Sequence, residues 1–289
     1  MPHLRHVRIV SQEKLAERTY RLRLICPEIA RVILPGQFLM LRLAGTNDPL
    51  LGRPFALYDT WGDDSSSPLG VDIVYLVVGS MTSRLCTVPA GSVVEVWGPL
   101  GRPLPAFSEL EQVVLVAGGI GQTPFVAYTH WLLGSRGYGG QAARPQARRV
   151  LLYYGVRTAA RLAGLTDFQT AGAQLYLASD DGSVGWHGSI LDRLQAEQPA
   201  GPLIGCGPEP MLKALARLAR QWQRPCWVSL ETPMACGIGA CFSCVTRIGT
   251  AHNWDYRRVC VDGPTFEAAL WHDAFSEQGS DAPLGSTGA

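Results

Sequence analysis

Residues 113–124 read VVLVAGGIGQTP, and this stretch decides the architecture of the middle of the chain. Residues 113–117 are an apolar run of strand length, the glycine turn GGIG follows at 118–121, and a helical pattern runs from 123 to about 133. A buried strand that turns through glycines into a helix is typical of a doubly wound parallel sheet. Such a turn can hold a nucleotide pyrophosphate on its N–H groups. However, a tight turn also needs glycine for structural reasons, and the full G-x-G-x-x-G fingerprint is missing.

A second turn of the same kind lies further along the chain. Residues 204–208 read IGCGP, after an apolar strand and before a helical stretch at 211–222. Further strands at 150–154 and 174–177 and a helix at 188–196 continue the alternation. Two glycine turns at the carboxyl ends of strands in one sheet define a crevice, where ligands bind in open α/β folds. Together the turns favour nucleotide binding.

The first hundred residues have a different pattern. Short stretches with strand character, such as 71–78 and 93–97, are separated by turns rich in Gly, Pro, Asp and Ser, and helical signals are few. This pattern predicts a small antiparallel β-barrel.

The whole chain is therefore expected to be a multi-domain α+β protein. The predicted parts are an antiparallel β-barrel domain at 1–104, a doubly wound α/β domain at 105–225, a small cysteine-bearing domain at 226–275 and a disordered tail at 276–289. Residues 134–149, rich in Gly, Ala, Arg and Gln, are predicted to form a surface loop.

Four cysteines near the C-terminus carry the strongest chemical signal. Cys236, Cys241 and Cys244 follow the C-x4-C-x2-C spacing of plant-type ferredoxins, and Cys260 follows after fifteen intervening residues. A loop that wraps a [2Fe–2S] cluster needs small residues, because its backbone must approach the sulfurs closely. The spacing therefore predicts a [2Fe–2S] cluster held by these four residues.

Two other interpretations of the cysteines stay open. Structural zinc sites usually pair their ligands as C-x2-C, whereas the first pair here is spaced by four. Ordinary buried cysteines are the third possibility, and we expect packing roles of this kind for Cys26, Cys86 and Cys226.

Composition excludes several classes of protein. Charged residues make up 17% of the 289 residues and the formal net charge is +1, which argues against a nucleic-acid binder. The longest apolar runs are only strand-length, so no membrane span is expected. The N-terminal residues lack the apolar core of a signal peptide, which predicts a cytoplasmic protein.

An ordered set of motifs resembles a known family. In order along the chain the motifs are GRPFA (52–56), GSMT (79–82), GPLG (98–101), GGIGQTP (118–124), SDDGSVG (179–185), CGPEPM (206–211) and CVDGPTF (260–266). With the cysteine loop at 236–244, the chain up to about residue 275 resembles the ferredoxin reductase-like electron-transfer subunit of NAD-linked, B-type dihydroorotate dehydrogenase. Each early motif is loose, but the ordered set is specific.

The resemblance implies an FAD in the barrel domain and NAD(H) in the α/β domain. The cofactor-binding residues that it implies are Arg53, Pro54, Phe55, Ala56, Gly79, Thr82, Gly118, Gly119, Gly121, Cys206 and Gly207. Arg53 would contact the FAD pyrophosphate, Phe55 would pack near the isoalloxazine, and Cys206 would lie near the nicotinamide. Two positions depart from the family pattern. Ala56 stands where a serine is usual, and Met81 where a glycine is frequent.

The implied function is electron transfer without a catalytic acid or base in this chain. Electrons would pass from an FMN-containing dihydroorotate dehydrogenase catalytic subunit, two copies of each chain assembling together, through the cluster and FAD to NAD⁺ in pyrimidine biosynthesis. Phe242, Trp254 and Tyr256 are candidates for the partner surface, or for packing around the cluster. Arg157 and Arg161 leave a preference for NADP open.

Two alternatives remain at this point. Related subunits serve hydrogenases, sulfite reductases and NADH-dependent ferredoxin:NADP oxidoreductases, so the partner could be a different one. A regulatory protein that uses a cluster or zinc to fold or to sense redox state is the second alternative, and the two glycine turns argue against it.

Overall fold

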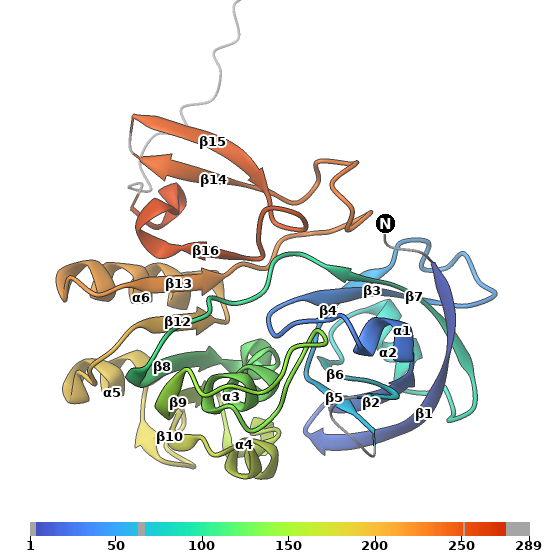
Figure 1. Cartoon of the computed structure of the whole chain (residues 1–289), viewed down its shortest axis with the longest axis horizontal. Helices are drawn as coiled ribbons and strands as arrows, with labels where there is room; N and C mark the ends of the chain where they lie inside the picture. The colour runs from blue at the N-terminus through green and yellow to red at the C-terminus, as the bar shows by residue number, and fades with distance from the viewer. Residues whose placement is uncertain (1–3, 63–66, 251, 276–289) are drawn as a thin grey trace, which may run out of the picture.

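The computed structural model describes residues 4–62, 67–250 and 252–275, so the predicted disordered tail at 276–289 lies outside the described residues. Two seven-stranded sheets and a two-stranded hairpin make up the molecule (Figure 1). The first sheet is formed by the N-terminal part of the chain and the second by the middle part, and the hairpin lies on the side of the molecule away from α3 and α4 (Figure 1).

The first sheet is antiparallel throughout, in the order β4-β3-β7-β1-β2-β6-β5. Its strands are β1 (Arg5–Ala16), β2 (Thr19–Ile25), β3 (Phe38–Leu43), β4 (Arg53–Ala56), β5 (Asp59–Trp61), β6 (Gly70–Leu76) and β7 (Val93–Leu100). Two short helices, α1 (Pro27–Ala30) and α2 (Ser80–Leu85), accompany it. Alternate residues of β2, such as Leu22 and Leu24, are fully buried, as the period of two in a strand requires.

The second sheet has the order β11-β10-β9-β8-β12-β13-β16. Its strands are β8 (Leu110–Gly118), β9 (Ala147–Val156), β10 (Gln174–Ser179), β11 (Trp186–His187), β12 (Leu203–Cys206), β13 (Cys226–Ser229) and β16 (Thr265–Glu267). The pairs from β11 to β13 are parallel, and β16 joins the edge antiparallel to β13. The chain runs outward from β8 to β10 and returns to β12 on the other side, so the order reverses between β8 and β12.

Helices cover both faces of this sheet. They are α3 (Phe125–Leu133), α4 (Leu165–Ala171), α5 (Ile190–Glu197) and α6 (Glu209–Gln221). The first, third and fourth lie close to the helical stretches that the sequence predicts, whereas α4 was not predicted. Val113 and Leu115 of β8 pack in the same apolar core as Phe125 of α3, whereas Val114 and Val116 pack in the second core. Both faces of β8 are buried, which explains why the strand is an unbroken apolar run.

The C-terminal part is built around the hairpin β14 (Val245–Thr250) and β15 (Asn253–Arg258). Four 3-10 helices complete the described structure: η1 (Gly119–Gln122), η2 (Ala159–Arg161), η3 (Ala268–Leu270) and η4 (His272–Ala274). Residues 226–229 and 265–267, which the sequence analysis grouped with the cysteines, pair with each other at the edge of the second sheet as β13 and β16. The cysteine-bearing part is therefore joined to that sheet by two strands.

The segment at 134–149 is not simply the surface loop that the sequence predicts. Tyr138 is buried, and its hydroxyl donates a hydrogen bond to Asp59 Oδ1 at 2.7 Å. Gly139 lies against Leu34. The segment thus packs onto the first sheet and ties the two sheets together. Within the described ranges, no helix has the length and apolar character needed to cross a membrane.

Candidate functional site

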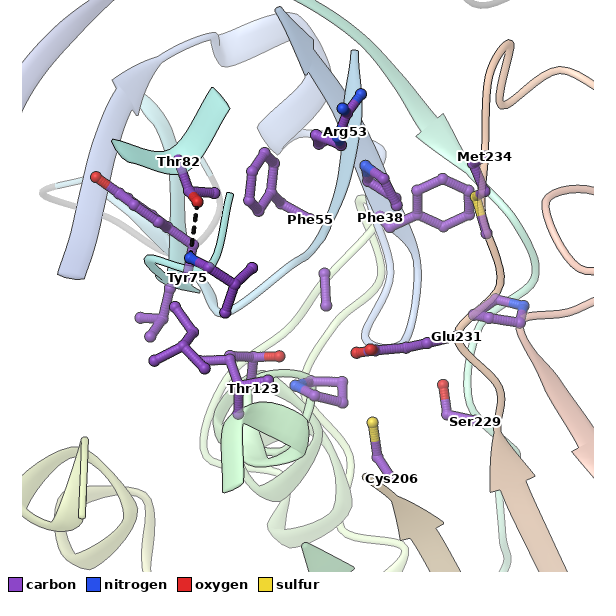
Figure 2. A pocket seen from close by; sticks show the side chains of 18 of the residues that line it. Phe38, Arg53, Phe55, Tyr75, Thr82, Thr123, Cys206, Ser229, Glu231 and Met234 are labelled. Atoms are coloured by element: carbon purple, nitrogen blue, oxygen red, sulfur yellow. Dashed lines mark hydrogen bonds between the residues drawn. The ribbon is translucent and has the colours of Figure 1, made fainter. Parts of the chain in front are cut away.

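A cavity of about 580 Å³ lies between the two large sheets (Figure 2). Its volume falls within the roughly 300–1,000 Å³ that ligand pockets span. The first sheet contributes predicted site residues from β4 and from the start of α2, which are Arg53, Pro54, Phe55, Ala56, Gly79 and Thr82. From the second sheet comes Cys206, at the end of β12. The fold therefore brings the two sets of motifs to one cavity.

Arg53 lies at the rim of this cavity, at the start of β4 (Figure 2). Its Nη1 donates hydrogen bonds to the carbonyl oxygens of Leu51 and Gly52, at 2.9 and 3.1 Å. These contacts orient the guanidinium and leave its other N–H groups free to bind an anion. Phe55 is nearly buried and packs edge-on against Tyr75, with ring centroids 5.9 Å apart.

Thr82 closes the turn that precedes α2. Its Oγ1 accepts hydrogen bonds from the N–H groups of Val78 and Gly79, at 3.0 and 3.2 Å, and donates one to Gly79 O at 3.1 Å. A Cβ on Gly79 would meet no atom within 4 Å, so the backbone there borders open space in the cavity. Met81, where the family frequently has glycine, is buried in the core.

The predicted glycines of the nucleotide turns lie outside the residues that line the cavity. A Cβ on Gly121 would stand 2.2 Å from the carbonyl oxygen of Cys206, and one on Gly207 would stand 2.9 Å from the backbone nitrogen of Gly118. These three glycines let the two turns pack backbone to backbone, which is the structural reason that the sequence left open. Gly119 differs, because it has a positive φ of 54° and open space where a Cβ would project.

Cys206, Ser229 and Glu231 form the opposite side of the cavity from Arg53 and Phe55 (Figure 2). Burial and the nearby Glu231 carboxylate raise the pKa of the Cys206 thiol, while a hydrogen bond with Ser229 acts against the rise. Desolvation likewise raises the pKa of Glu231. The Glu231 side chain lines the cavity and is in contact with solvent there.

The sequence analysis missed Ser229 and Glu231. Ser229 is the last residue of the parallel strand β13 and Glu231 lies two residues beyond it, at the same edge of the sheet at which Cys206 ends β12. The carboxyl-end rule would have found them if β13 had been recognised as a strand of this sheet. Thr232 also lines the cavity, and its buried Oγ1 has no hydrogen-bond partner among the residues that the structure describes. A buried hydroxyl of this kind is a site for a ligand's polar atom.

The four predicted cluster cysteines come together in two pairs. The thiols of Cys236 and Cys241 hydrogen-bond to each other, and so do those of Cys244 and Cys260. Cys236 and Cys260 are close enough to interact electrostatically. Among the described residues no three His, Cys, Asp or Glu side chains form a group that could hold a single metal ion. Two pairs of thiols suit two irons, each of which needs two protein sulfurs.

Backbone N–H groups surround the sulfur of Cys236. Although burial acts in the opposite direction, hydrogen bonds from the N–H groups of Ile238, Cys241 and Ala240 lower the pKa of this thiol to about 7. A Cβ on Gly239 would stand 2.7 Å from Val261, so the loop needs glycine there to close on the segment of Cys260. The donor set and the tight loop both fit a cluster.

The cavity and the cysteine loop are continuous in the chain. Residues 229–234 line the cavity, and Cys236 follows two residues later. Trp97 of β7 donates a hydrogen bond from Nε1 to the carbonyl oxygen of Cys236, at 2.9 Å, which holds the loop against the first sheet. The cysteine site therefore lies next to the cavity between the two sheets.

Comparison with solved structures defines the class of protein. The NADH-dependent reduced ferredoxin-NADP oxidoreductase structure has a TM-score of 0.75 and 26% sequence identity, and the match covers 93% of this chain and 91% of that one. The cytochrome b5 reductase domain of Ulva prolifera nitrate reductase shares the fold at a TM-score of 0.54 and 18% identity, over 73% of this chain and 89% of that one. The fold and the cavity place the chain among the ferredoxin reductase-like oxidoreductases.

Sequence comparison then identifies the family. Residues 231–270 match the model of the iron-sulfur cluster binding domain of dihydroorotate dehydrogenase B. The dihydroorotate dehydrogenase B (NAD(+)) electron transfer subunits of Geobacillus thermodenitrificans (strain NG80-2) and Desulforamulus reducens (strain ATCC BAA-1160 / DSM 100696 / MI-1) are 37% and 32% identical, each over 90% of this chain and over 95% and 94% of their own lengths. The chain belongs to the family of dihydroorotate dehydrogenase B (NAD(+)) electron transfer subunits, which confirms the resemblance found in the sequence.

Proposed function

We propose that this chain passes electrons from an FMN-containing dihydroorotate dehydrogenase catalytic subunit, through a [2Fe–2S] cluster and FAD, to NAD⁺ in pyrimidine biosynthesis. The observation that carries the proposal is the continuity of the cavity lining at 229–234 with the cysteine loop that starts at Cys236. FAD supplies the conversion between two-electron exchange with NAD(H) and one-electron exchange with the cluster. The chain's own residues hold and orient these groups.

FAD would occupy the side of the cavity formed by the first sheet. Arg53 offers a fixed guanidinium for the pyrophosphate, and the open space beside Gly79 lets a phosphate approach the backbone. Phe55 offers an apolar ring for the isoalloxazine, as does Pro54, and Thr82 keeps the turn in shape. Because Ala56 has no hydroxyl, it cannot donate the hydrogen bond that a serine there would give to the flavin.

NAD(H) would enter from the side formed by the second sheet. Gly118, Gly119, Gly121 and Gly207 shape the two turns, and Gly119 borders open space into which a phosphate fits. At the bottom of the crevice Cys206 would lie near the nicotinamide, together with Ser229 and Glu231. These side chains would exclude water from the reacting rings.

The surroundings of Arg157 and Arg161 favour NAD over NADP. Arg161 Nε lies 3.6 Å from the Glu17 carboxylate, so its charge is already balanced. The acidic residues Asp180 and Asp181 lie beside Arg157, and the N–H group of Asp181 donates a hydrogen bond to the carbonyl oxygen of Arg157 at 3.3 Å. Carboxylates at the end of a strand suit a ribose hydroxyl and repel a 2′-phosphate.

The cluster would be held by Cys236, Cys241, Cys244 and Cys260, one pair of thiols for each iron. With this assignment the chain would consist of an FAD domain at 1–104, an NAD domain at 105–225 and a cluster domain at 226–275. Since β13 and β16 belong to the second sheet, the boundary between the last two domains crosses a shared sheet.

The partner would dock beside the cluster. Exposed apolar side chains lie on the cysteine loop, on strand β15 and at the end of η3, and they are Ile238, Phe242, Trp254, Tyr256 and Leu270. Aromatic residues of this kind are enriched where proteins bind each other. Two copies of each chain are the expected assembly, and the cytoplasmic location stays a prediction.

A different partner is the second candidate. The structural match to the NADH-dependent reduced ferredoxin-NADP oxidoreductase covers nearly the whole chain, which shows that a similar architecture serves another complex. Family membership at 37% identity favours the dihydroorotate dehydrogenase partner.

The test is anaerobic purification of the chain, alone and coexpressed with an FMN-containing dihydroorotate dehydrogenase catalytic subunit. From the chain alone we expect flavin absorption bands, FAD rather than FMN on extraction, and about two irons and two sulfides per chain. The coexpressed complex should reduce NAD⁺ with dihydroorotate, whereas the chain alone should not. Zinc without flavin or sulfide would overturn the cluster and the electron-transfer function. A chain with both cofactors that fails to bind the catalytic subunit would favour the second candidate.

A further inference from the structure

Arg258 ends strand β15, two residues before the cluster ligand Cys260. Its Nη1 donates a hydrogen bond to the carbonyl oxygen of Gly239 at 3.2 Å, and its guanidinium carbon lies 5.3 Å from the ring centroid of Phe242. Gly239 and Phe242 both belong to the cysteine loop. The guanidinium therefore lies on the loop that carries three of the four ligands, while its backbone leads to the fourth.

The carbonyl group of Gly239 belongs to the same peptide unit as the N–H group of Ala240. That N–H group donates a hydrogen bond to the sulfur of Cys236. A chain of contacts thus runs from the guanidinium of Arg258, through one peptide, to a ligand sulfur. Donation to the carbonyl oxygen polarises the peptide, and consecutive hydrogen bonds of this kind strengthen one another by about 10–30%.

The polarised peptide and the positive charge of Arg258 both act on the reduction of the cluster. Reduction adds one negative charge to a cluster, and stronger N–H donors to the sulfurs and a nearby positive charge stabilise that charge. Asp262 moderates the effect, because its Oδ2 lies 3.6 Å from Arg258 Nε and accepts a hydrogen bond from Arg258 N at 2.9 Å. Arg258 and Asp262 therefore act on the cluster with opposite signs.

We propose that Arg258 is a positioning residue that raises the reduction potential of the cluster, through the Gly239–Ala240 peptide and through its own charge. The inference rests on the proposed function, since it requires a [2Fe–2S] cluster at the four cysteines. Its consequence is that the cluster accepts electrons from the partner more readily than the same loop would without the guanidinium.

The neighbouring residue offers a matched control. Arg257 belongs to the same strand and carries the same charge, but its Nη2 has a carboxylate of Asp255 only at 3.9 Å and its side chain is 52% exposed. Replacing Arg257 changes the net charge of the chain by the same amount as replacing Arg258. A difference between the two variants therefore reports the position of Arg258 and not total charge.

The experiment is a redox titration of the purified chain followed by electron paramagnetic resonance, with iron and sulfide assays on every variant. Arg258→Gln should shift the midpoint potential of the cluster to more negative values, Arg258→Lys should shift it less, and Arg257→Gln should leave it unchanged. Asp262→Asn should shift it in the positive direction. Flavin absorption should stay the same in all of them.

The outcomes are separable. A wild-type chain without about two irons and two sulfides would reject the proposed function before any variant is compared. A wild-type chain with the cluster, together with an Arg258→Gln variant that has full iron content and an unchanged potential, would reject only the role of Arg258. An equal shift in Arg257→Gln would reject it too. If Arg258→Gln assembles no cluster, Asp262→Asn decides, and a potential that does not rise overturns the inference.

Discussion

Arg21 in β2 and Asp167 in α4 are 146 residues apart in the sequence, yet Arg21 Nη2 lies 2.6 Å from Asp167 Oδ2. The hydroxyl of Tyr58 donates a hydrogen bond to the same oxygen, also at 2.6 Å. The Asp167 side chain is 26% exposed. One carboxylate on α4 thus accepts two hydrogen bonds from the N-terminal part of the chain, and these bonds hold α4 against the first sheet.

Asp167→Ala should therefore destabilise the protein. The variant leaves the Tyr58 hydroxyl and the Arg21 guanidinium without their acceptor, which costs about 1–3 kcal/mol of unfolding free energy. Denaturant unfolding followed by fluorescence measures the loss. Glu111→Ala is the control, because Glu111 is 65% exposed, its ion pairs are 3.6 and 4.0 Å long, and we expect a change below about 0.5 kcal/mol. Equal losses in both variants would contradict the role given to Asp167.

His130 of α3 lies beside Asp59 of β5, where the two large sheets meet, and it should make the stability of the protein depend on pH. Burial lowers its pKa, and Arg136 adds to the decrease, while Asp59 and Asp167 act against it. Its Nδ1 lies 2.7 Å from Ser135 Oγ. Below the unfolded-state pKa of about 6.5 the unfolded chain binds more protons than the folded one, so stability falls as pH falls.

His130→Gln removes this titration. Between pH 7.5 and 5.5 the melting temperature of the wild type should decrease more than that of His130→Gln, so that the gap between them narrows. His252→Gln, at an exposed position, is the control and should follow the wild type. A constant gap between wild type and His130→Gln across this range would show that His130 keeps an ordinary pKa.

Arg53→Gln should weaken flavin binding. A charge-assisted hydrogen bond contributes roughly 1.5–3 kcal/mol, which corresponds to about a ten- to hundred-fold increase in the Kd for FAD. Fluorescence titration of the flavin-free chain with FAD measures this change. Arg8→Gln removes the same charge from an exposed position on β1 and should leave the Kd unchanged. A Kd for Arg53→Gln within about two-fold of the wild-type Kd is smaller than the loss of one hydrogen bond would cause. That result would show that Arg53 does not bind the flavin.

Cys241→Ser should lose the iron-sulfur cluster but keep FAD. Cys241 is the exposed member of its thiol pair, so replacing it is expected to leave the fold intact. Iron and sulfide should fall well below about two per chain, because a serine oxygen is a poor ligand for a [2Fe–2S] cluster, while the FAD bands remain. Cys86→Ser changes a cysteine outside the cluster site and should retain both cofactors. Full iron content in Cys241→Ser would rule out the assigned ligand set.

Tyr256→Glu should weaken assembly with the catalytic subunit. Tyr256 is 57% exposed on β15 beside Trp254, with ring centroids 5.4 Å apart, so it can serve as an aromatic anchor. Loss of such an anchor typically costs at least 1.4 kcal/mol, or about ten-fold in Kd, measured by surface plasmon resonance. Val93→Glu on β7, where the side chain is 43% exposed, is the control and should bind normally. Normal binding by Tyr256→Glu would place the interface elsewhere.

The sequence by itself determined the features that depend on neighbouring residues. The C-x4-C-x2-C spacing predicted Cys236, Cys241 and Cys244 as cluster ligands, because residues on one short loop stay close together whatever the rest of the chain does. The apolar run at 113–117 followed by glycines identified a buried parallel strand and its turn, since both faces of that strand are covered. The order of such local motifs was enough to identify the family.

Only the tertiary structure decided which distant residues share a site. Glu231 faces Cys206 because β13 pairs with β12, and no local pattern encodes which strands become neighbours. Tyr138 is buried against the first sheet, where its hydroxyl donates a hydrogen bond to Asp59, although its own segment has the composition of a surface loop. Arg258 reaches the Gly239 peptide because the chain brings the segment of Cys260 beside the loop of Cys236, Cys241 and Cys244. In each case the contact depends on how the chain packs, and packing is a property of the whole fold.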